Sequence, residues 1–311
     1  MTLAVGSQKA RGGWPRMTKY AILLVLAALA GGGWWFYHRL GQARWQIDEL
    51  IENDHRFSAT EARDAWERAV RQMGLAYYAL PAEKKAQPYW RLCAKFLAEG
   101  DYSRSFEMFR RAYDLAPEPS LHLGAYLAAL AKEADWLRVL IAQPPAACSP
   151  EDLRYFRACL AWAAETPAAV LAVSEEPVQA APKDEARPPR GLLWLRFMRA
   201  RALMEMGRNT SAFDILDNQV GPHLKIMTND PRVAINFATV VVQAGEKCGE
   251  YRQALVCALL AADFLDRVED KSWDGTRREL RESIARLKER LGSASETANP
   301  VSVRPSAPAR E

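Results

Sequence analysis

The sequence lacks the short motifs that mark most catalytic and metal-binding sites. Its 311 residues include only four histidines, and none stands in the HExxH arrangement that binds zinc. There is no GxSxG elbow for a serine nucleophile and no glycine-rich loop ending in GKS or GKT for a nucleotide phosphate. We therefore expect neither enzyme activity nor a cofactor or metal site.

Cysteines are few, and none has the CxxC spacing of a zinc or redox site. The five are Cys93, Cys148, Cys159, Cys248 and Cys257. An odd number leaves at least one thiol free or intermolecular in an oxidising compartment. We expect small, buried core residues, as free cysteines commonly are. The sequence leaves open a disulfide between Cys148 and Cys159 or between Cys248 and Cys257.

Excess charge is confined to one end of the chain. The formal net charge is +4, and residues 1–19 supply all of it through Lys9, Arg11, Arg16 and Lys19, with no acidic residue among them. Elsewhere Arg and Lys alternate with Asp and Glu, as on ordinary solvated helix faces. No basic stripe is left to follow a phosphate backbone, so we expect no nucleic-acid partner.

One long uncharged run follows this basic end. Tyr20–Tyr37 is 18 residues without a charge, and it closes with the aromatic residues Trp34, Trp35, Phe36 and Tyr37. At about 1.5 Å per residue, such a helix just reaches the roughly 30 Å thickness of bilayer hydrocarbon. The sequence therefore predicts a transmembrane anchor at 20–37 after a cytoplasmic N-terminus at 1–19. By the positive-inside rule, residues 38–311 are exported, which in a bacterium means the periplasm.

Two other interpretations of this run remain open. Ala28-Leu29-Ala30 followed by Gly31 resembles the cleavage site of a signal peptide after a short apolar core. Against cleavage, the apolar run continues through the glycines into the aromatic residues. The third interpretation, a buried helix of a soluble protein, fits poorly with the terminal position and the basic flank.

The clearest structural pattern lies between residues 89 and 117. Its apolar and small positions are Tyr89, Leu92, Cys93, Phe96, Ser105, Phe109 and Ala112. Gly100 marks the turn, and Pro117 ends the unit. The spacing of three and four predicts two amphipathic helices joined at the glycine. The unit resembles a tetratricopeptide repeat, with signature W-x2-L-G-x2-Y, A-x3-F and P within about 34 residues. Tyr89, Cys93 and Ser105 replace the family's Trp, Gly and Ala by residues of the same size class.

Degenerate copies of this unit flank it, as expected because one helix pair cannot bury its apolar face alone. The copies are Leu121–Lys132 with Ala134–Ala142, a pair that begins at the N-caps Ser149 and Thr166, Leu192–Met206 with Thr210–Leu216, and Pro231–Gln243 with Gly249–Phe264. Asp152 is expected to reach back to Ser149, and Glu61 to Ser58 as a capping box. The flanking helices are a short one at Trp45–Ile51, one at Ser58–Leu80, and a capping helix at Asp274–Leu291. The predicted fold is all-α, a tetratricopeptide-like helical-repeat solenoid preceded by one transmembrane helix. A general helical bundle is the alternative.

Composition divides the exported part into two lobes. Residues 174–190 contain four prolines among charged and small residues, which favours an extended linker over a helix. We therefore expect an N-terminal lobe at 38–173 and a C-terminal lobe with its capping helix at 191–292. The tail at 293–311 is rich in Pro, Ser and Ala and is predicted to be disordered.

The resemblance implies a groove that binds a protein, because the first helix of each pair lines the concave surface of such arrays. The positions implied to face that groove are Trp90, Ala94, Leu97, Trp194, Phe197, Arg201 and Met204. Aromatic, Met and Arg side chains dominate many binding hot spots. Trp90 and Ala94 replace the Lys and Asn with which some family members clamp a C-terminal carboxylate, so we expect a different ligand. The competing interpretation is that the aromatic residues pack against the neighbouring repeat.

The sequence thus predicts a membrane-anchored scaffold and not an enzyme. Its exported domain is expected to bind protein partners within an envelope assembly, secretion or translocation complex. Two alternatives remain, an enzyme or regulator with a site between the lobes, and an organelle-surface receptor whose repeats face the cytosol. Fold resemblance alone does not name the partner or the oligomeric state.

Overall fold

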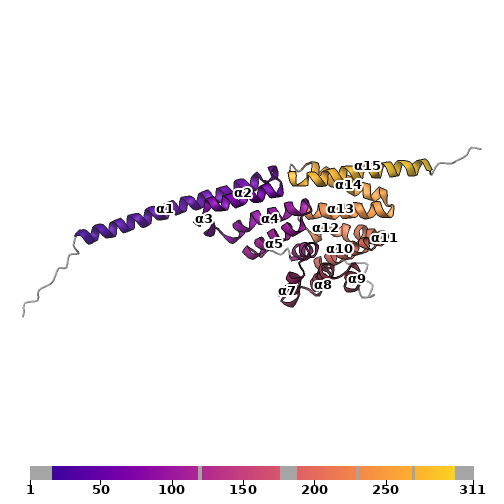
Figure 1. Ribbon diagram of the computed structural model, residues 1–311, viewed down its shortest axis with the longest axis horizontal. Coiled ribbons are helices and arrows are strands. Elements are labelled where there is room, and N and C mark those ends of the chain that lie inside the picture. The colour runs from indigo at the N-terminus through magenta and orange to yellow at the C-terminus, as the bar shows by residue number, and fades with distance from the viewer. Residues whose placement is uncertain (1–15, 118–120, 176–187, 229–230, 268–269, 298–311) are drawn as a thin grey trace, which may run out of the picture.

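The computed structural model describes residues 16–117, 121–175, 188–228, 231–267 and 270–297, and the side chains among them from residue 31 to residue 292 except 231 and 232. Throughout these residues the chain is helical and contains no strand (Figure 1). The predicted all-α class is therefore confirmed.

The first helix, α1, is the longest of the described elements. It spans Arg16–Glu52 without a break, a length of 37 residues. Its N-terminal half projects from the body of the molecule (Figure 1). It contains residues 20–37, and the short helix predicted at Trp45–Ile51 is its C-terminal end. Within the described residues, no helix is long and apolar enough to cross a membrane. The side chains of residues 16–30, which hold most of the predicted span, lie outside the described part.

The N-terminal region of the body is a short helical hairpin against α1. Its elements are η1 (Asp54–Arg56), α2 (Ala59–Met73) and α3 (Leu75–Tyr78). Ser58 caps α2 through the predicted capping box, in which its hydroxyl accepts from the amide of Glu61 while the Glu61 carboxylate accepts from the amide of Ser58. The helix expected to reach Leu80 is interrupted at Gly74, whose φ of +56° is accessible mainly to glycine.

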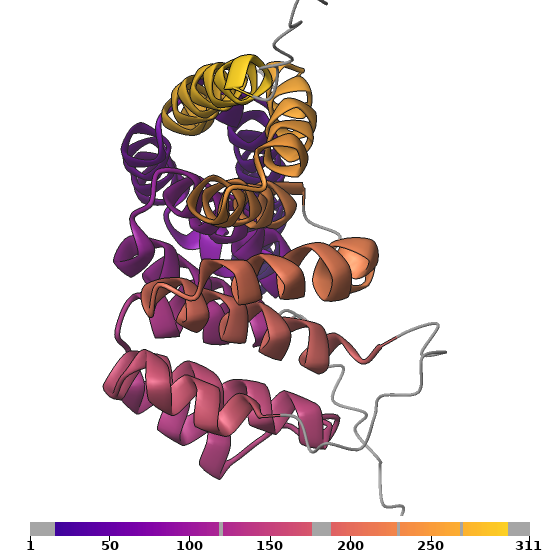
Figure 2. The same ribbon diagram turned by 90° about the vertical axis from the view of Figure 1, so that its right-hand side faces the viewer.

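Antiparallel helix pairs make up the rest of the body. They are α4 (Ala82–Ala98) with α5 (Tyr102–Leu115), α6 (Leu121–Leu130) with α7 (Ala134–Ala142), α8 (Pro150–Ala164) with α9 (Pro167–Ser174), α10 (Arg190–Glu205) with α11 (Asn209–Asp214), and α13 (Pro231–Cys248) with α14 (Tyr251–Asp266). The helices contact their partners within pairs and also across pairs, from α5 to α6, α6 to α8, α8 to α10 and α11 to α13. Figure 2 shows the resulting layers.

Small residues sit where the two helices of a pair approach each other, as the repeat pattern predicts. In the first pair, Cys93 and Ser105 are both buried, and the Ser105 hydroxyl donates to the Cys93 carbonyl at 2.8 Å. In the last pair, a Cβ added at Gly245 would lie 2.8 Å from the Cβ of Ala254. Any larger residue at this crossing would force α13 and α14 apart, because packed interiors do not absorb such overlap.

The later helices differ in length from the predicted ones. The turn expected at Ala244–Gly249 is helical, because α13 continues to Cys248 and only Gly249, at φ +88°, breaks the chain before α14. After α11 come the π-helical η2 (Ile215–Val220), η3 (Gly221–His223) and α12 (Leu224–Met227). The capping helix α15 (Asp274–Thr297), preceded by η4 (Lys271–Trp273), extends into the tail predicted to be disordered. Residues 298–311 lie outside the described part.

The hydrophobic core is not interrupted at the predicted linker. Residues 176–187 lie outside the described part, but α10 beyond them packs directly on α8 and α9. One cluster of buried side chains extends from Ala43 to Ala244, and a second joins α13, α14 and α15. The helices on either side of the proline-rich stretch therefore share one core.

Candidate functional site

A cleft opens between the N-terminal and C-terminal parts of the body. Its volume is about 450 Å³, within the range of ordinary ligand sites. It is bounded by the turn from α4 to α5, by one face of α13, and by η4 with the first turn of α15. These elements lie far apart in the sequence but contact one another, α4 with α13 and η4, and η1 with η4.

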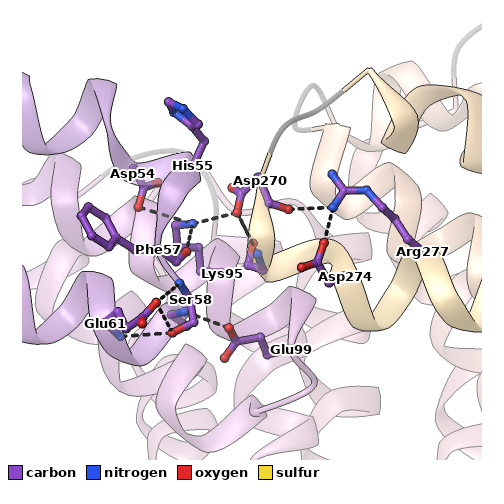
Figure 3. A network of polar contacts seen from close by, with 12 residues as sticks. Asp54, His55, Phe57, Ser58, Glu61, Lys95, Glu99, Asp270, Asp274 and Arg277 are labelled. Atoms are coloured by element: carbon purple, nitrogen blue, oxygen red, sulfur yellow. Dashed lines mark hydrogen bonds and ion pairs between the residues drawn. The ribbon is translucent and has the colours of Figure 1, made fainter.

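A buried lysine holds one side of the cleft to the other (Figure 3). The side chain of Lys95, on α4, is fully buried, and its Nζ lies 2.8 Å from Asp270 Oδ1 and 3.5 Å from Asp54 Oδ1. The same Nζ donates to the carbonyl of Phe57 at 2.9 Å. Asp270 Oδ1 also accepts from the amide and the hydroxyl of Ser272. We call Lys95, Asp54 and Asp270 the clasp, because they join η1, α4 and η4.

Two further contacts hold the same region together (Figure 3). Glu99, near the end of α4, accepts from the amide of Ala59 in the first turn of α2 at 2.8 Å. Arg277, on α15, donates to the carboxylate of Asp274 and to the carbonyl of Asp270. The first contact joins the start of α2 to the end of α4, and the second holds the clasp residue Asp270 to the first turn of α15.

The charge of Asp270 is favoured by its partners. Burial alone would raise the pKa of this carboxyl, but hydrogen bonds from Lys95 and Ser272 together with the positive charge of Lys95 outweigh it and lower the pKa below its ordinary value of 3.8. At pH values just below 3.8, the folded protein therefore binds fewer protons at Asp270 than the unfolded chain does. The stability that Asp270 contributes is present above pH 3.8 and is lost as the pH falls through the lower folded pKa.

We therefore expect Asp270→Asn to flatten the acid limb of the stability curve. Urea unfolding of the two proteins at steps between about pH 5 and pH 2 measures this limb. The free energy of unfolding of the native protein should fall more steeply with acid than that of the variant. Parallel curves would show that Asp270 does not carry this dependence.

The half-buried Arg201 lines the cleft, and behind it lies the buried Tyr126. The Arg201 guanidinium, on α10, donates to the Tyr126 hydroxyl and lies 5.6 Å from the Tyr126 ring and 5.7 Å from the Trp162 ring. The Tyr126 hydroxyl in turn donates to Asn236 Oδ1 at 3.2 Å. Burial raises the pKa of Tyr126 in spite of the nearby guanidinium, so the phenol is neutral and the wall keeps one positive charge.

Polar side chains follow one face of α13 through the cleft. Asn236, Thr239 and Gln243 are spaced by three and four and all line the cleft, as the helical period requires of residues on one face. A second hollow of about 190 Å³, lined by Thr239, Gln243, Glu246 and Arg286 among others, continues along α13 and α15. The two hollows share Thr239, Gln243 and Glu279, so they form one groove whose edge carries amide, hydroxyl and carboxylate groups.

The structure distributes the seven predicted groove residues over two environments. Leu97 and Arg201 line the cleft. Trp194 and Phe197 are each 2% exposed, and Ala94 is 7% exposed, so these three pack within the body. Their burial favours the packing interpretation over partner contact.

The remaining two predicted residues also pack against neighbours. Trp90 is half-buried with its ring 5.4 Å from that of Phe109, and Met204 is half-buried against the main core. Three residues that line the cleft, Asn236, Thr239 and Gln243, were not predicted from the sequence. Their signal is a polar stripe of spacing three and four within the otherwise apolar stretch 233–245.

A histidine–aspartate pair lies elsewhere, within the aromatic core, where the His122 ring stacks on those of Tyr155 and Trp194. His122 Nε2 is 2.6 Å from Asp152 Oδ1, and Asp152 belongs to the capping box that Ser149 forms at the start of α8, as predicted. Burial lowers the pKa of His122, although Asp152 opposes the shift, so the ring is neutral near pH 7. The pair joins α6 to α8, and we assign it a structural role.

Neither cysteines nor acidic clusters suggest a second site. All five cysteines are free thiols. In the part of the chain that the structure describes, no three or more His, Cys, Asp and Glu side chains gather in a way that would hold a metal ion. Comparison with family models, curated proteins and solved structures finds no match to this chain. The geometry of the cleft is therefore the basis on which a function can be assigned.

Proposed function

We propose that the protein is a membrane-anchored, tetratricopeptide-like helical-repeat scaffold that binds an extended segment of a partner protein in the cleft. The observation that carries the proposal is the polar edge of α13, where Asn236, Thr239 and Gln243 line a hollow of about 450 Å³. Stacked helix pairs that present a lined cleft are a common architecture for peptide recognition.

The chemistry of the cleft suits a polypeptide main chain. An extended segment carries one N–H donor and one C=O acceptor per residue, and carboxamide side chains offer both complements. Asn236 is held in place by Tyr126, so its amide is oriented before a ligand arrives. Such preorganisation reduces the entropy lost on binding. The polar lining favours an extended segment over an apolar helix as the ligand.

The exposure of the aromatic residues of α1 supports the proposed membrane anchor. Trp34, Trp35 and Tyr37 are 71%, 57% and 77% exposed, and with Phe36 they surround the helix. Four consecutive helical residues point in all directions, so no single packing surface could cover them, whereas a lipid interface would. With the basic residues of 1–19 in the cytoplasm, the body lies on the exported side, where envelope assembly, secretion or translocation complexes would supply the partner.

The double variant Thr239→Val/Gln243→Ala tests the cleft. Losing two hydrogen-bonding groups should weaken partner capture about tenfold, because each such bond contributes roughly 0.5–1.5 kcal/mol. Gln253→Ala is the matched control, since Gln253 is exposed on α14 outside the cleft. Capture is measured by crosslinking and affinity purification of the full-length chain from native membranes, and melting is expected to stay unchanged in both variants.

A photoreactive residue at position 243 identifies what enters the cleft. Adducts to a defined polypeptide at 243 and none at 253 support the proposal. Adducts to small molecules alone favour an enzyme or regulator with its site between the N-terminal and C-terminal parts. Equal capture by the double variant and by the native chain would place partner binding elsewhere on the surface.

A further inference from the structure

Three large apolar side chains are exposed at the end of the body from which α1 projects. Leu75 and Tyr78 on α3 are 80% and 74% exposed, and Trp45 on α1 is 63% exposed. Figure 1 shows α3 at this end, beside α1, and the two helices are in contact. We call Leu75 and Tyr78, which lie one turn apart on α3, the α3 tip; Trp45 lies on the face of α1 opposite the buried Ala43 and Ile47. Exposed apolar groups gathered in one place are typical of an interaction surface.

The α3 tip lies close to the aromatic residues of α1 along the direction of that helix. After the turn at η1, α2 runs back along α1 for 15 residues, which is about 22 Å. Its end therefore returns to roughly the level of residues 38–43 of α1, one or two turns beyond Tyr37. An ion pair fixes this arrangement, since Lys84 Nζ at the start of α4 lies 2.8 Å from Asp48 Oδ1 on α1.

The surroundings of the tip are basic. Residues 38–48, 66–73 and 75–85 contain six basic and three acidic side chains, all exposed or half-buried: Arg39, Arg44, Arg68, Arg71, Lys84, Lys85, Asp48, Glu67 and Glu83. A bilayer with anionic lipids attracts juxtamembrane basic residues. The charge therefore complements a lipid surface.

We propose that the α3 tip is a second membrane contact, seated in the headgroup layer of the bilayer that α1 enters. The proposal rests on the proposed anchoring through α1. Leu75 and Tyr78 insert among the headgroups on one side of α1 and Trp45 on the other, while the surrounding basic side chains face the anionic lipids. Two contacts prevent the body from swinging on one helix. They hold the cleft at the far end of the 17-residue α4, about 25 Å from the membrane surface.

Photocrosslinking to lipid tests this inference. Full-length protein with p-benzoylphenylalanine at position 75 or 78 is placed in phosphatidylethanolamine–phosphatidylglycerol vesicles, irradiated and analysed for lipid adducts by mass spectrometry. Position 34 reports on the anchor, and position 139, 62% exposed on α7, is the remote control. Leu75 and Tyr78 are exposed, so the probe should leave melting unchanged.

The expected result is lipid adducts at 34, 75 and 78, at least fivefold above position 139. Lipid adducts at position 34, with either no adducts or only polypeptide adducts at positions 75 and 78, would overturn the membrane contact of the α3 tip. The proposed anchor would still stand. Absence of lipid adducts at 34 as well would overturn both proposals. Adducts between two copies of the chain at 75 or 78 would show that a second copy covers the tip, and would likewise overturn the inference.

Discussion

Replacement of Lys95 by alanine is expected to lower the free energy of unfolding by about 3–5 kcal/mol. The Lys95 side chain is 0% exposed, and the side chains of Asp54 and Asp270 are 8% and 6% exposed. Removing the cation leaves two carboxylates close together in a region from which water is excluded, and an uncompensated buried charge costs about this much. The measurement is urea unfolding followed by circular dichroism at neutral pH.

Lys84→Ala is the matched control for the clasp. Lys84 makes an ion pair with Asp48 at the same distance of 2.8 Å, but both side chains are more than one-third exposed. Pairs of this kind contribute about 0–1 kcal/mol because solvent screens them. If both lysine variants lose the same small amount, the clasp does not hold the body together.

The clasp also has a consequence for binding. It joins η1, α4 and η4, and Ser272 next to Asp270 lines the cleft. A chain without the clasp would let the C-terminal helices move away from α4, and the cleft would lose one wall. Lys95→Ala is therefore expected to weaken partner capture even at temperatures where the helices remain folded.

Local signals in the sequence predicted the elements well. The capping boxes at Ser58 and Ser149 and the cap at Thr166 are confirmed, because each depends on side chains and amides three residues apart. The small residues Cys93 and Ser105 meet at a helix crossing as expected. Such features need no knowledge of the distant chain.

The cleft was missed because it is made by distant residues. Lys95 and Asp270 are 175 positions apart, and nothing near Lys95 in the sequence distinguishes it from a solvated lysine. The resemblance to tetratricopeptide repeats also implied that the first helices line an open concave surface. Here α4 contacts α13 and η4, and the first helices α6, α8 and α10 pack against one another. Aromatic side chains predicted to face a partner therefore face other helices.

Trp194 is the sharpest case, and Trp194→Ala is expected to cost about 3–5 kcal/mol, as for other buried tryptophans. Its ring lies 5.7 Å from Tyr126, 5.8 Å from Tyr155 and 6.2 Å from Phe197, and its Nε1 donates to the Met227 carbonyl. The variant would leave a large cavity between α6, α8 and α10. Differential scanning calorimetry should show a large drop in melting temperature.

Trp45→Ala supplies the comparison, because the Trp45 side chain is 63% exposed and its loss should change the free energy of unfolding by no more than about 0.5 kcal/mol. If Trp194→Ala melts like the native chain and yet loses the partner, Trp194 contacts the partner and the inner face opens in solution. If it melts early, Trp194 belongs to the core. The proposed recognition surface is then the stripe of Asn236, Thr239 and Gln243, which line the cleft.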